Sequence, residues 1–409
     1  MKLKICVILP FVVDSNYVIN PQIGILMNLA NYDHEIDCIC LSKNHNNNLV
    51  GLNNINVINI DYFEMSHNNY GVGYFIEYSY NKLYKFFKAY KIILSKNEKY
   101  DFIFARNSIL DAILALIVKK SRSLVLFEIS NPLDQEKIDH TIENKKYLVF
   151  WQIIDDIRKY IMKKLISWSD LVLITTRYFL PEMKEYNFPI SKFFPYPNGV
   201  DKNILCLKMT QQNNINKSHP RNTSFVYIGT LAKARDMKFI ICAFEDVIKS
   251  NPHINLHIFG DGTDKPNLET YVKNKKLEDN IYFYGKIPQK DLFKHISTMD
   301  VGLSVIPPYS FYTVSSPIKT LEYLALGIPI IANMEILEHK EIGNGCKCGV
   351  FINYKEEELK DAIVYCDKNK EVLKDYSING KKWINNNRTY DILSKKLEAR
   401  LFQLIEKHK

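Results

Sequence analysis

A lysine and a glutamate, Lys319 and Glu322, open the apolar segment in the stretch SSPIKTLEYLALGIPIIA. Ser316 and Pro317 favour a helix that starts beside them, because serine caps free amides and proline is tolerated in the first turn. Gly327 is typical of the residue that ends such a helix. The first turn of a helix presents free N–H groups, which attract anions. The sequence therefore predicts an anion site with a lysine and a carboxylate beside it.

Three other loops in the same half of the chain have related chemistry, and each follows an apolar run typical of a strand. They are Gly229 with Lys233 and Arg235, the turn Gly260–Asp261–Gly262, and Gly285 with Lys286. Glycine lets a ligand approach the backbone closely, whereas lysine and arginine neutralise phosphate. A carboxylate next to them can accept hydrogen bonds from ribose hydroxyls. Together the four loops predict a cradle for a nucleoside diphosphate.

Regular elements must bring these loops to one place. Short continuous apolar runs alternate with helical patterns along the chain, which predicts parallel sheets buried on both faces. The expected helices are 24–31, 109–119, 148–167, 237–249, 265–276 and 289–298. A polar stretch, 207–224, has the composition of a loop or linker and separates two such arrays.

The pattern predicts an α/β protein of two Rossmann-like domains that face each other across a cleft. Ligands of such domains bind at the carboxyl ends of the strands. We expect one Rossmann-like domain over residues 1–200 and a second one, which carries the diphosphate cradle, over 201–383. A last helix, about 384–409, is expected to return to the first domain.

Composition limits the class of protein. The 409 residues exceed one ordinary domain, 46% are hydrophobic, and the net charge of +9 is spread along the chain. This charge suits phosphorylated ligands and anionic lipid, but no basic-aromatic motif of a nucleic-acid module occurs, so we expect no nucleic-acid partner. The eight cysteines lack paired zinc spacing, and reduced thiols indicate the cytoplasm. No apolar run approaches the roughly 18–20 residues of a spanning helix.

The order of the motifs carries a family resemblance. IGTL with KARD, then IFGDG, YGKIP and SSPIKTLEYLALGIPII, resembles the nucleotide-binding domain of GT-B glycosyltransferases, above all the retaining family four (glycosyl transferases group 1). That family includes many bacterial surface-polysaccharide enzymes. The NGVD phrase at Asn198–Asp201 is similar to their domain junction, and the resemblance is most specific over 196–352. It implies transfer of a sugar, with retention, from a nucleotide sugar to a glycan or lipid-linked acceptor in surface polysaccharide or glycoconjugate synthesis.

The resemblance implies that the domain 1–200 lies on the acceptor side and that the domain 201–383 binds the nucleotide sugar. It also implies roles for individual residues. Glu322 would bind the donor ribose, and Lys319 would lie by the diphosphate. Arg235 stands at the family's phosphate-binding lysine, in a Lys-Gly phrase that here is Arg235-Asp236. The other residues expected at the donor are Gly229, Thr230, Gly260, Asp261, Gly262, Ser316, Pro317 and Ile318. The nucleotide sugar, with UDP favoured, is a co-substrate, so no cofactor is expected, and the lack of a DxD motif in a suitable loop predicts no metal.

Three positions depart from the family pattern. Val314 replaces a first glutamate eight residues before Glu322, Thr230 replaces a phosphate-binding arginine, and Ile129 follows Glu128 where the family has an acceptor-side histidine. The catalytic residues are therefore unassigned. Two alternatives stay open: a non-catalytic GT-B-like partner subunit, and a sugar-nucleotide epimerase, which would need acidic catalytic residues in the cleft.

The segment 81–99 combines apolar residues at helical spacing with lysines that fall mostly on the other side. The apolar set is Leu83, Phe86, Phe87, Tyr90, Ile93 and Leu94, and the lysines are Lys82, Lys85, Lys88 and Lys91. The pattern predicts an amphipathic helix whose apolar stripe packs on the sheet with the lysines in solvent. The same lysines can attract anionic headgroups, so we also expect reversible attachment to the inner face of the cell membrane.

Overall fold

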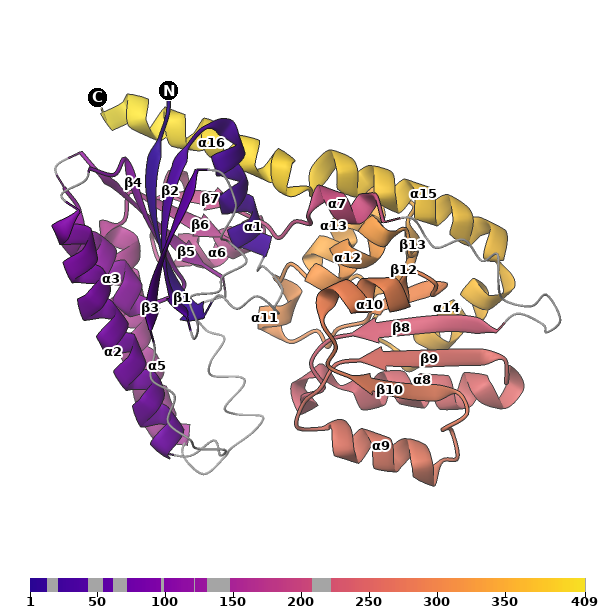
Figure 1. Cartoon of the computed structure of the whole chain (residues 1–409). Coiled ribbons are helices and arrows are strands. Elements are labelled where there is room, and N and C mark those ends of the chain that lie inside the picture. The colour runs from indigo at the N-terminus through magenta and orange to yellow at the C-terminus, as the bar shows by residue number, and fades with distance from the viewer. Residues whose placement is uncertain are drawn as a thin grey trace. The chain divides into compact units, whose positions relative to one another are not determined.

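The computed structural model of the protein describes residues 1–12, 21–42, 54–61, 72–96, 99–120, 122–130, 148–207 and 222–408. The chain divides into two compact units, which we call unit 1 (Met1–Pro197 with Ser394–Lys409) and unit 2 (Asn198–Leu393). Each unit contains one parallel sheet flanked by helices (Figure 1). The expectation of an α/β protein with two parallel sheets is confirmed. Most of the expected linker, 208–221, lies outside the described residues.

Unit 1 contains a sheet with the strand order β3-β2-β1-β4-β5-β6-β7. All neighbouring pairs are parallel. The strands are β1 (Lys4–Val12), β2 (Glu35–Ser42), β3 (Ile55–Asp61), β4 (Phe102–Arg106), β5 (Leu124–Ile129), β6 (Leu171–Ile174) and β7 (Phe193–Pro195). The central strands β4, β5 and β6 are buried along their whole length, as expected for a sheet covered on both faces.

The described helices of unit 1 lie on the faces of this sheet. They are α1 (Pro21–Asn28), α2 (Val72–Ser95), α3 (Ile109–Val118), α5 (Leu148–Trp168), α6 (Leu180–Glu185) and, from Ser394 on, α16 (Tyr390–His408). The last helix is tied to the N-terminal part of the chain. Ser394 Oγ donates to the backbone oxygen of Ile25 at 2.7 Å, and Glu398 lies 2.8 Å from Nε2 of the buried His34.

Unit 2 repeats the same architecture with the strand order β10-β9-β8-β11-β12-β13, again parallel throughout. Its strands are β8 (Thr223–Ile228), β9 (Ile254–Phe259), β10 (Ile281–Gly285), β11 (Val301–Ser304), β12 (Ile330–Asn333) and β13 (Gly349–Ile352). Counted within the unit, this is the 3-2-1-4-5-6 order of a doubly wound sheet, and the order reverses between β8 and β11. Ligands of this fold bind beside that reversal.

The helices of unit 2 cover both faces of its sheet. They are α7 (Lys202–Leu205), α8 (Met237–Ser250), α9 (Lys265–Asn274), α10 (Gln289–Ile296), α11 (Ser310–Thr313), α12 (Ile318–Leu326), α13 (Leu337–Gly345), α14 (Glu356–Lys368) and α15 (Lys370–Asn387). Alternate residues of β8 face the two cores: Phe225 joins the cluster of α8 and α14, and Val226 joins that of α12. The six expected helices are confirmed, and the first of them differs most, beginning at Pro21.

Candidate functional site

The helix α12 begins where the sequence predicts. Pro317 is its N-cap residue, and Gly327 ends it in the left-handed conformation with φ of 78°. Every residue from Thr320 to Leu326 is buried, which fixes the helix against the sheet. Its amino end, which carries Lys319, follows β11 at the carboxyl edge of the sheet, where the order of the strands reverses.

Backbone contacts join three of the four predicted loops. The amide of Gly229, after β8, donates to Phe259 at the end of β9 at 3.0 Å, and the amide of Gly260 donates to Gly285, after β10, at 2.9 Å. A Cβ atom added to Gly260, whose φ is 147°, would lie 1.8 Å from the backbone oxygen of Gly229. One added to Gly262 would lie 2.5 Å from the backbone of Leu231. The glycines are therefore needed for the loops to approach each other.

Two cations meet at this edge of unit 2. Lys319 Nζ lies 3.9 Å from the ring centroid of Tyr227, and Arg235 Cζ lies 4.4 Å from that of Tyr312. Burial, and then the positive charge of Arg235, lower the pKa of Lys319 well below 10.5. In the part of the chain that the structure describes, neither cation forms an ion pair with a carboxylate. An anion bound here would relieve the repulsion between them.

The turn after Arg235 is formed by Asp236. Asp236 adopts the left-handed conformation with φ of 47°, at the position where the resemblance expects glycine. Aspartate is among the few residues that tolerate this conformation. Its Oδ2 accepts a hydrogen bond from the Tyr354 hydroxyl at 3.0 Å, and the Tyr354 ring stacks on Phe239 at 4.2 Å. The turn therefore keeps the conformation of a glycine turn although it contains none.

Glu322 is a buried carboxylate with one hydrogen-bond donor in the described structure. Its side chain is 8% exposed, and Gln289 Nε2, on the first residue of α10, donates to Oε1 at 2.7 Å. Burial raises the pKa of Glu322 from 4.5 to about 7, although Gln289 partly opposes the shift. Such a carboxylate has acceptor capacity left for the hydroxyls of a ligand. Gln289 directly follows the YGKIP loop in the sequence, but no motif marked it as a site residue.

A buried polar network supports α12 from behind. Thr320 Oγ1 lies 2.7 Å from Ser304 Oγ at the end of β11 and 2.9 Å from His339 Nε2. His339 Nδ1 donates to the backbone oxygen of Asn333 at 3.1 Å. Burial lowers the pKa of His339 to about 3, so the imidazole is neutral and Nε2 accepts. These residues were not predicted, because Ser304 and Thr320 look like ordinary polar residues beside apolar ones and His339 lies in a charged stretch.

The first residue of the NGVD motif contacts the loop before α12. Asn198 Nδ2 donates to the backbone oxygen of Ser316 at 2.6 Å, just before α12. Gly199 lies so close to the last turn of α15 that an added Cβ would be 2.8 Å from the backbone oxygen of Arg388. The phrase is therefore part of the support for α12.

The remaining predicted residues lie at the rim of this edge. Thr230 and Asp261 are exposed, and Asp261 Oδ1 accepts from the amide of Gly262 at 2.8 Å. Ile318, the first residue of α12, is half-buried. Within the described residues, no group of three or more His, Cys, Asp or Glu side chains could hold a metal ion. None of the described helices is both long and apolar enough to cross a membrane.

Comparison with known proteins agrees with this geometry. Residues 209–383 match the family model described as glycosyl transferases group 1. The alpha-monoglucosyldiacylglycerol synthase of Acholeplasma laidlawii is 28% identical over 192 residues, which are 46% of this chain and 46% of that protein. The match to this curated relative therefore spans about half of its length.

Solved structures are similar over a longer stretch. Sucrose-phosphate synthase from Thermosynechococcus elongatus has a TM-score of 0.73 at 14% identity, over 99% of this chain and 100% of that one. Anabaena HepE, solved in complex with UDP and glucose, has a TM-score of 0.66 at 14% identity, over 98% and 99% of the two chains. At this identity the likeness shows the fold, and residues 209–383 add the family. Residues 209–383 belong to the glycosyl transferases group 1 family, and the whole chain has the fold of GT-B glycosyltransferases.

Proposed function

We propose that the protein transfers a sugar from a nucleotide-sugar donor, with UDP favoured as the nucleotide, to a glycan or lipid-linked acceptor. The observation that carries the proposal is the pair of Arg235 and Lys319 at the amino end of α12, two cations without a carboxylate partner among the described residues. A diphosphate supplies the charge that this arrangement lacks. The name of the Acholeplasma relative and the UDP bound to Anabaena HepE support a lipid acceptor and a UDP-linked donor respectively.

Each part of the proposed donor site has a chemical role. Arg235 and Lys319 would bind the diphosphate together with the amides near Ser316. Negative charge builds up on the diphosphate as the sugar departs, and fixed cations and helix-end amides stabilise that charge. Glu322, oriented by Gln289, would accept hydrogen bonds from the ribose hydroxyls. Transfer with retention follows from the family resemblance, and the group that activates the acceptor is unassigned.

The two units would bind different substrates. We propose that unit 2 binds the donor and that unit 1, corresponding to the expected domain 1–200 with the returning C-terminal helix, binds the acceptor. Surface polysaccharide or glycoconjugate synthesis in the cytoplasm, at the inner face of the cell membrane, fits an acceptor that is a glycan or lipid.

A donor screen tests this proposal. The purified chain is heated with UDP-, GDP- and CMP-sugars, and release of free sugar from radiolabelled forms of the same donors is measured. Binding to the folded state raises the unfolding temperature. We expect a shift and slow donor hydrolysis with a UDP-sugar, both lost in the Lys319→Ala variant. Hydrolysis that survives unchanged in that variant, or no shift with any nucleotide sugar, would contradict the proposed site.

The same screen separates the alternatives. A partner subunit that has lost catalysis would bind a nucleotide sugar without hydrolysing it in the presence of any acceptor extract. An epimerase would convert the donor sugar to its epimer without releasing the nucleotide. We expect neither pattern.

A further inference from the structure

The helix α2 is rotated about its axis from the orientation that the sequence predicts. Among its described side chains, Asn81, Lys85, Ala89 and Ile93 are buried, and of these only Ile93 belongs to the predicted apolar stripe. Lys85 Nζ donates to both carboxylate oxygens of Asp111 on α3, at 2.7 and 2.8 Å, and to the backbone oxygen of Leu9 at 2.7 Å. This buried ion pair turns the lysine inward, so the predicted apolar stripe is only partly covered.

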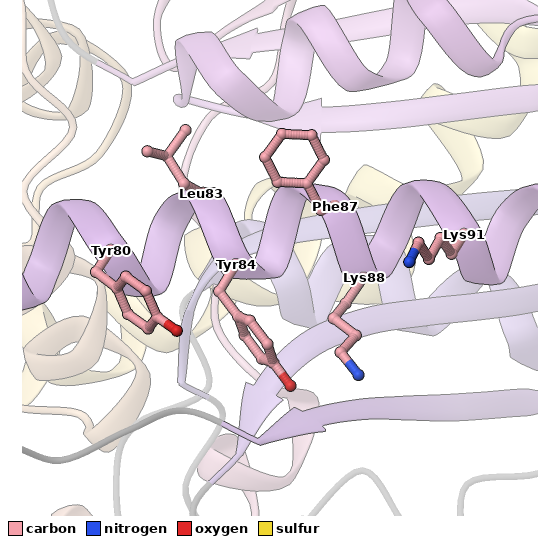
Figure 2. Close-up of a pocket in the computed structure, with 6 residues that line it drawn as sticks. All are labelled: Tyr80, Leu83, Tyr84, Phe87, Lys88 and Lys91. Atoms are coloured by element: carbon pink, nitrogen blue, oxygen red, sulfur yellow. The ribbon is translucent and has the colours of Figure 1, made fainter.

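Large apolar side chains of α2 are exposed as a result. The exposed fractions are 55% for Tyr80, 49% for Leu83, 59% for Phe87 and 46% for Leu94. Figure 2 shows Leu83 and Phe87 on one side of the helix and Tyr80, Tyr84 and Lys88 on the other. These residues, with Lys91, line a shallow hollow on the surface of unit 1.

The helix α5 presents a second row of the same kind. Ile153, Ile157, Tyr160 and Trp168 are 56%, 56%, 64% and 61% exposed, and the spacing of these residues places them on one side of the helix. The exposed Lys164 lies in the same row, with Nζ 5.5 Å from the ring centroid of Tyr160.

The two rows belong to one layer of helices. The helix α3 packs against both α2 and α5, and Figure 1 shows the three helices beside one another in unit 1. Ile117 of α3 is itself 55% exposed. We call the outward side of α2, α3 and α5 the helical face. So many large apolar side chains on one surface mark an interaction site, because isolated exposed residues are common but clusters are not.

The charges on the helical face are mainly positive. Lys88, Lys91 and Lys164 are exposed, whereas Asp111 and Asp155 are buried and paired with cations inside the layer. Among the described side chains of these helices, the one exposed carboxylate is Asp156. A second copy of this chain would bring lysines against lysines. A surface with negative charge at its boundary and hydrocarbon beneath it would satisfy both kinds of side chain.

We propose that the helical face docks on an anionic lipid surface. The apolar rows of α2 and α5 enter the boundary between headgroups and acyl chains, and the lysines beside them contact lipid phosphates. The apolar contacts and the cations act together, so the attachment is reversible and weakens as salt screens the lysines. The proposal concerns unit 1 and does not depend on the donor site in unit 2.

Vesicle co-sedimentation tests the proposal on the full chain. The probes are vesicles of phosphatidylcholine with and without 30% phosphatidylglycerol, in about 0.05 M and 0.5 M salt, on either side of the range where screening becomes strong. We expect binding to the anionic vesicles at low salt, and little binding to the neutral ones. Equal binding to both kinds of vesicle, or to neither, overturns the proposal.

Two pairs of variants locate the surface. Lys88→Gln/Lys91→Gln should weaken binding about 30-fold, which corresponds to roughly 1 kcal/mol for each lysine. The control Lys273→Gln/Lys347→Gln changes the net charge equally at exposed sites of unit 2 and should leave binding unchanged. If the control loses as much binding as the test variant, the effect comes from net charge alone. That result would overturn the assignment of docking to the helical face.

A second test variant and its control measure the apolar contribution to binding. Phe87→Ser/Ile157→Ser should weaken binding at least tenfold, whereas Ile378→Ser, at a 66% exposed position of α15, should not. Light scattering on the same samples detects self-association. If the natural protein is a dimer and the Phe87→Ser/Ile157→Ser variant is a monomer, the helical face binds a second copy of the chain. That result would overturn the lipid proposal. The thermal shift with a UDP-sugar, measured in parallel, should be unchanged in every variant, so failure here is distinct from failure of the proposed function.

Discussion

At the scale of single residues, the pKa values of Glu322 and Lys319 in the candidate donor site are both shifted towards the neutral form. Burial raises the pKa of Glu322 to about 7, and burial with the charge of Arg235 lowers the pKa of Lys319. Both shifts mean that the protein's own groups at this site destabilise the charged forms of Glu322 and Lys319, which a ligand of matching charge and hydrogen bonding would stabilise. Shifts of this kind in a cluster of polar groups are typical of functional sites.

The Glu322→Gln variant should be more stable than the natural protein at high pH and weaker in donor binding. The folded carboxyl has a pKa of about 7 against 4.5 unfolded, so its contribution to stability falls as pH rises from about 4.5 to about 7. At pH 8 the variant should gain on the order of 2–3 kcal/mol, and near pH 4.5 almost nothing. Urea denaturation at both pH values measures this, with Trp383 as the reporter of unit 2 after Trp151 and Trp168 are changed to phenylalanine.

The control is Glu269→Gln, a carboxylate that is 47% exposed. It should change neither stability nor donor affinity. If Glu322→Gln binds the UDP-sugar as tightly as the natural protein, the assignment of the ribose to this carboxylate is wrong.

Arg235 and Lys319 should act on the diphosphate alone. Changing either to alanine should weaken UDP binding at least tenfold and leave uridine binding nearly unchanged, because only the phosphates lie beside these cations. Diphosphate should also raise the lowered pKa of Lys319, so binding takes up protons. Calorimetry in buffers of different ionisation enthalpy measures that uptake. An equal loss of UDP and uridine affinity would contradict the assignment.

At the scale of elements, contacts between glycine backbones decide whether the loops can meet. Gly260→Ala should destabilise unit 2 by several kcal/mol, because its Cβ would overlap the backbone oxygen of Gly229, which cannot move aside as a side chain can. The control is Gly345→Ala, at the end of α13, where the nearest atom to the new Cβ is Trp383 Nε1 at 3.7 Å. We expect no more than a small change there. Circular dichroism on heating both variants checks the difference, and equal melting would contradict the close approach.

Local patterns predicted the helices well but not all of their orientations. The expected helix 237–249 matches α8, and Ser316-Pro317 marked the start of α12 to within a residue. By contrast, the orientation of α2 depends on Lys85 pairing with Asp111, a residue 26 positions away on another helix. Periodicity within α2 contains no information about that partner.

The same limit applies to the candidate site. Lys319 and Glu322 could be predicted because a helix start, a cation and a carboxylate lie together in the sequence. Gln289 could not be predicted, because it contacts Glu322, a residue 33 positions away on another helix. His339 was also missed, because it becomes recognisable only when Thr320 and Ser304 lie against it in the folded chain.

At the scale of the whole molecule, unit 1 is built from two separate parts of the chain. Leu397 and Leu401 of α16 are fully buried in it, although 196 residues of unit 2 lie between them and the rest of unit 1. Leu401→Ala should therefore destabilise unit 1 by about 2–5 kcal/mol, the usual range for a buried leucine. The UDP-sugar thermal shift of unit 2 should survive, and loss of nucleotide binding in this variant would contradict the separation of the units.

This connectivity has a consequence for how the protein is made. A ribosome exposes residues 1–197 first, but they cannot bury the surface that α16 covers until residues 394–408 have been synthesised. Unit 2 is complete before that point, so the nascent chain is expected to finish its second unit before its first, against the usual N-terminal-first order. During that interval His34 and Ile25 lack their α16 partners, so the nascent chain is expected to expose a surface that the finished protein covers.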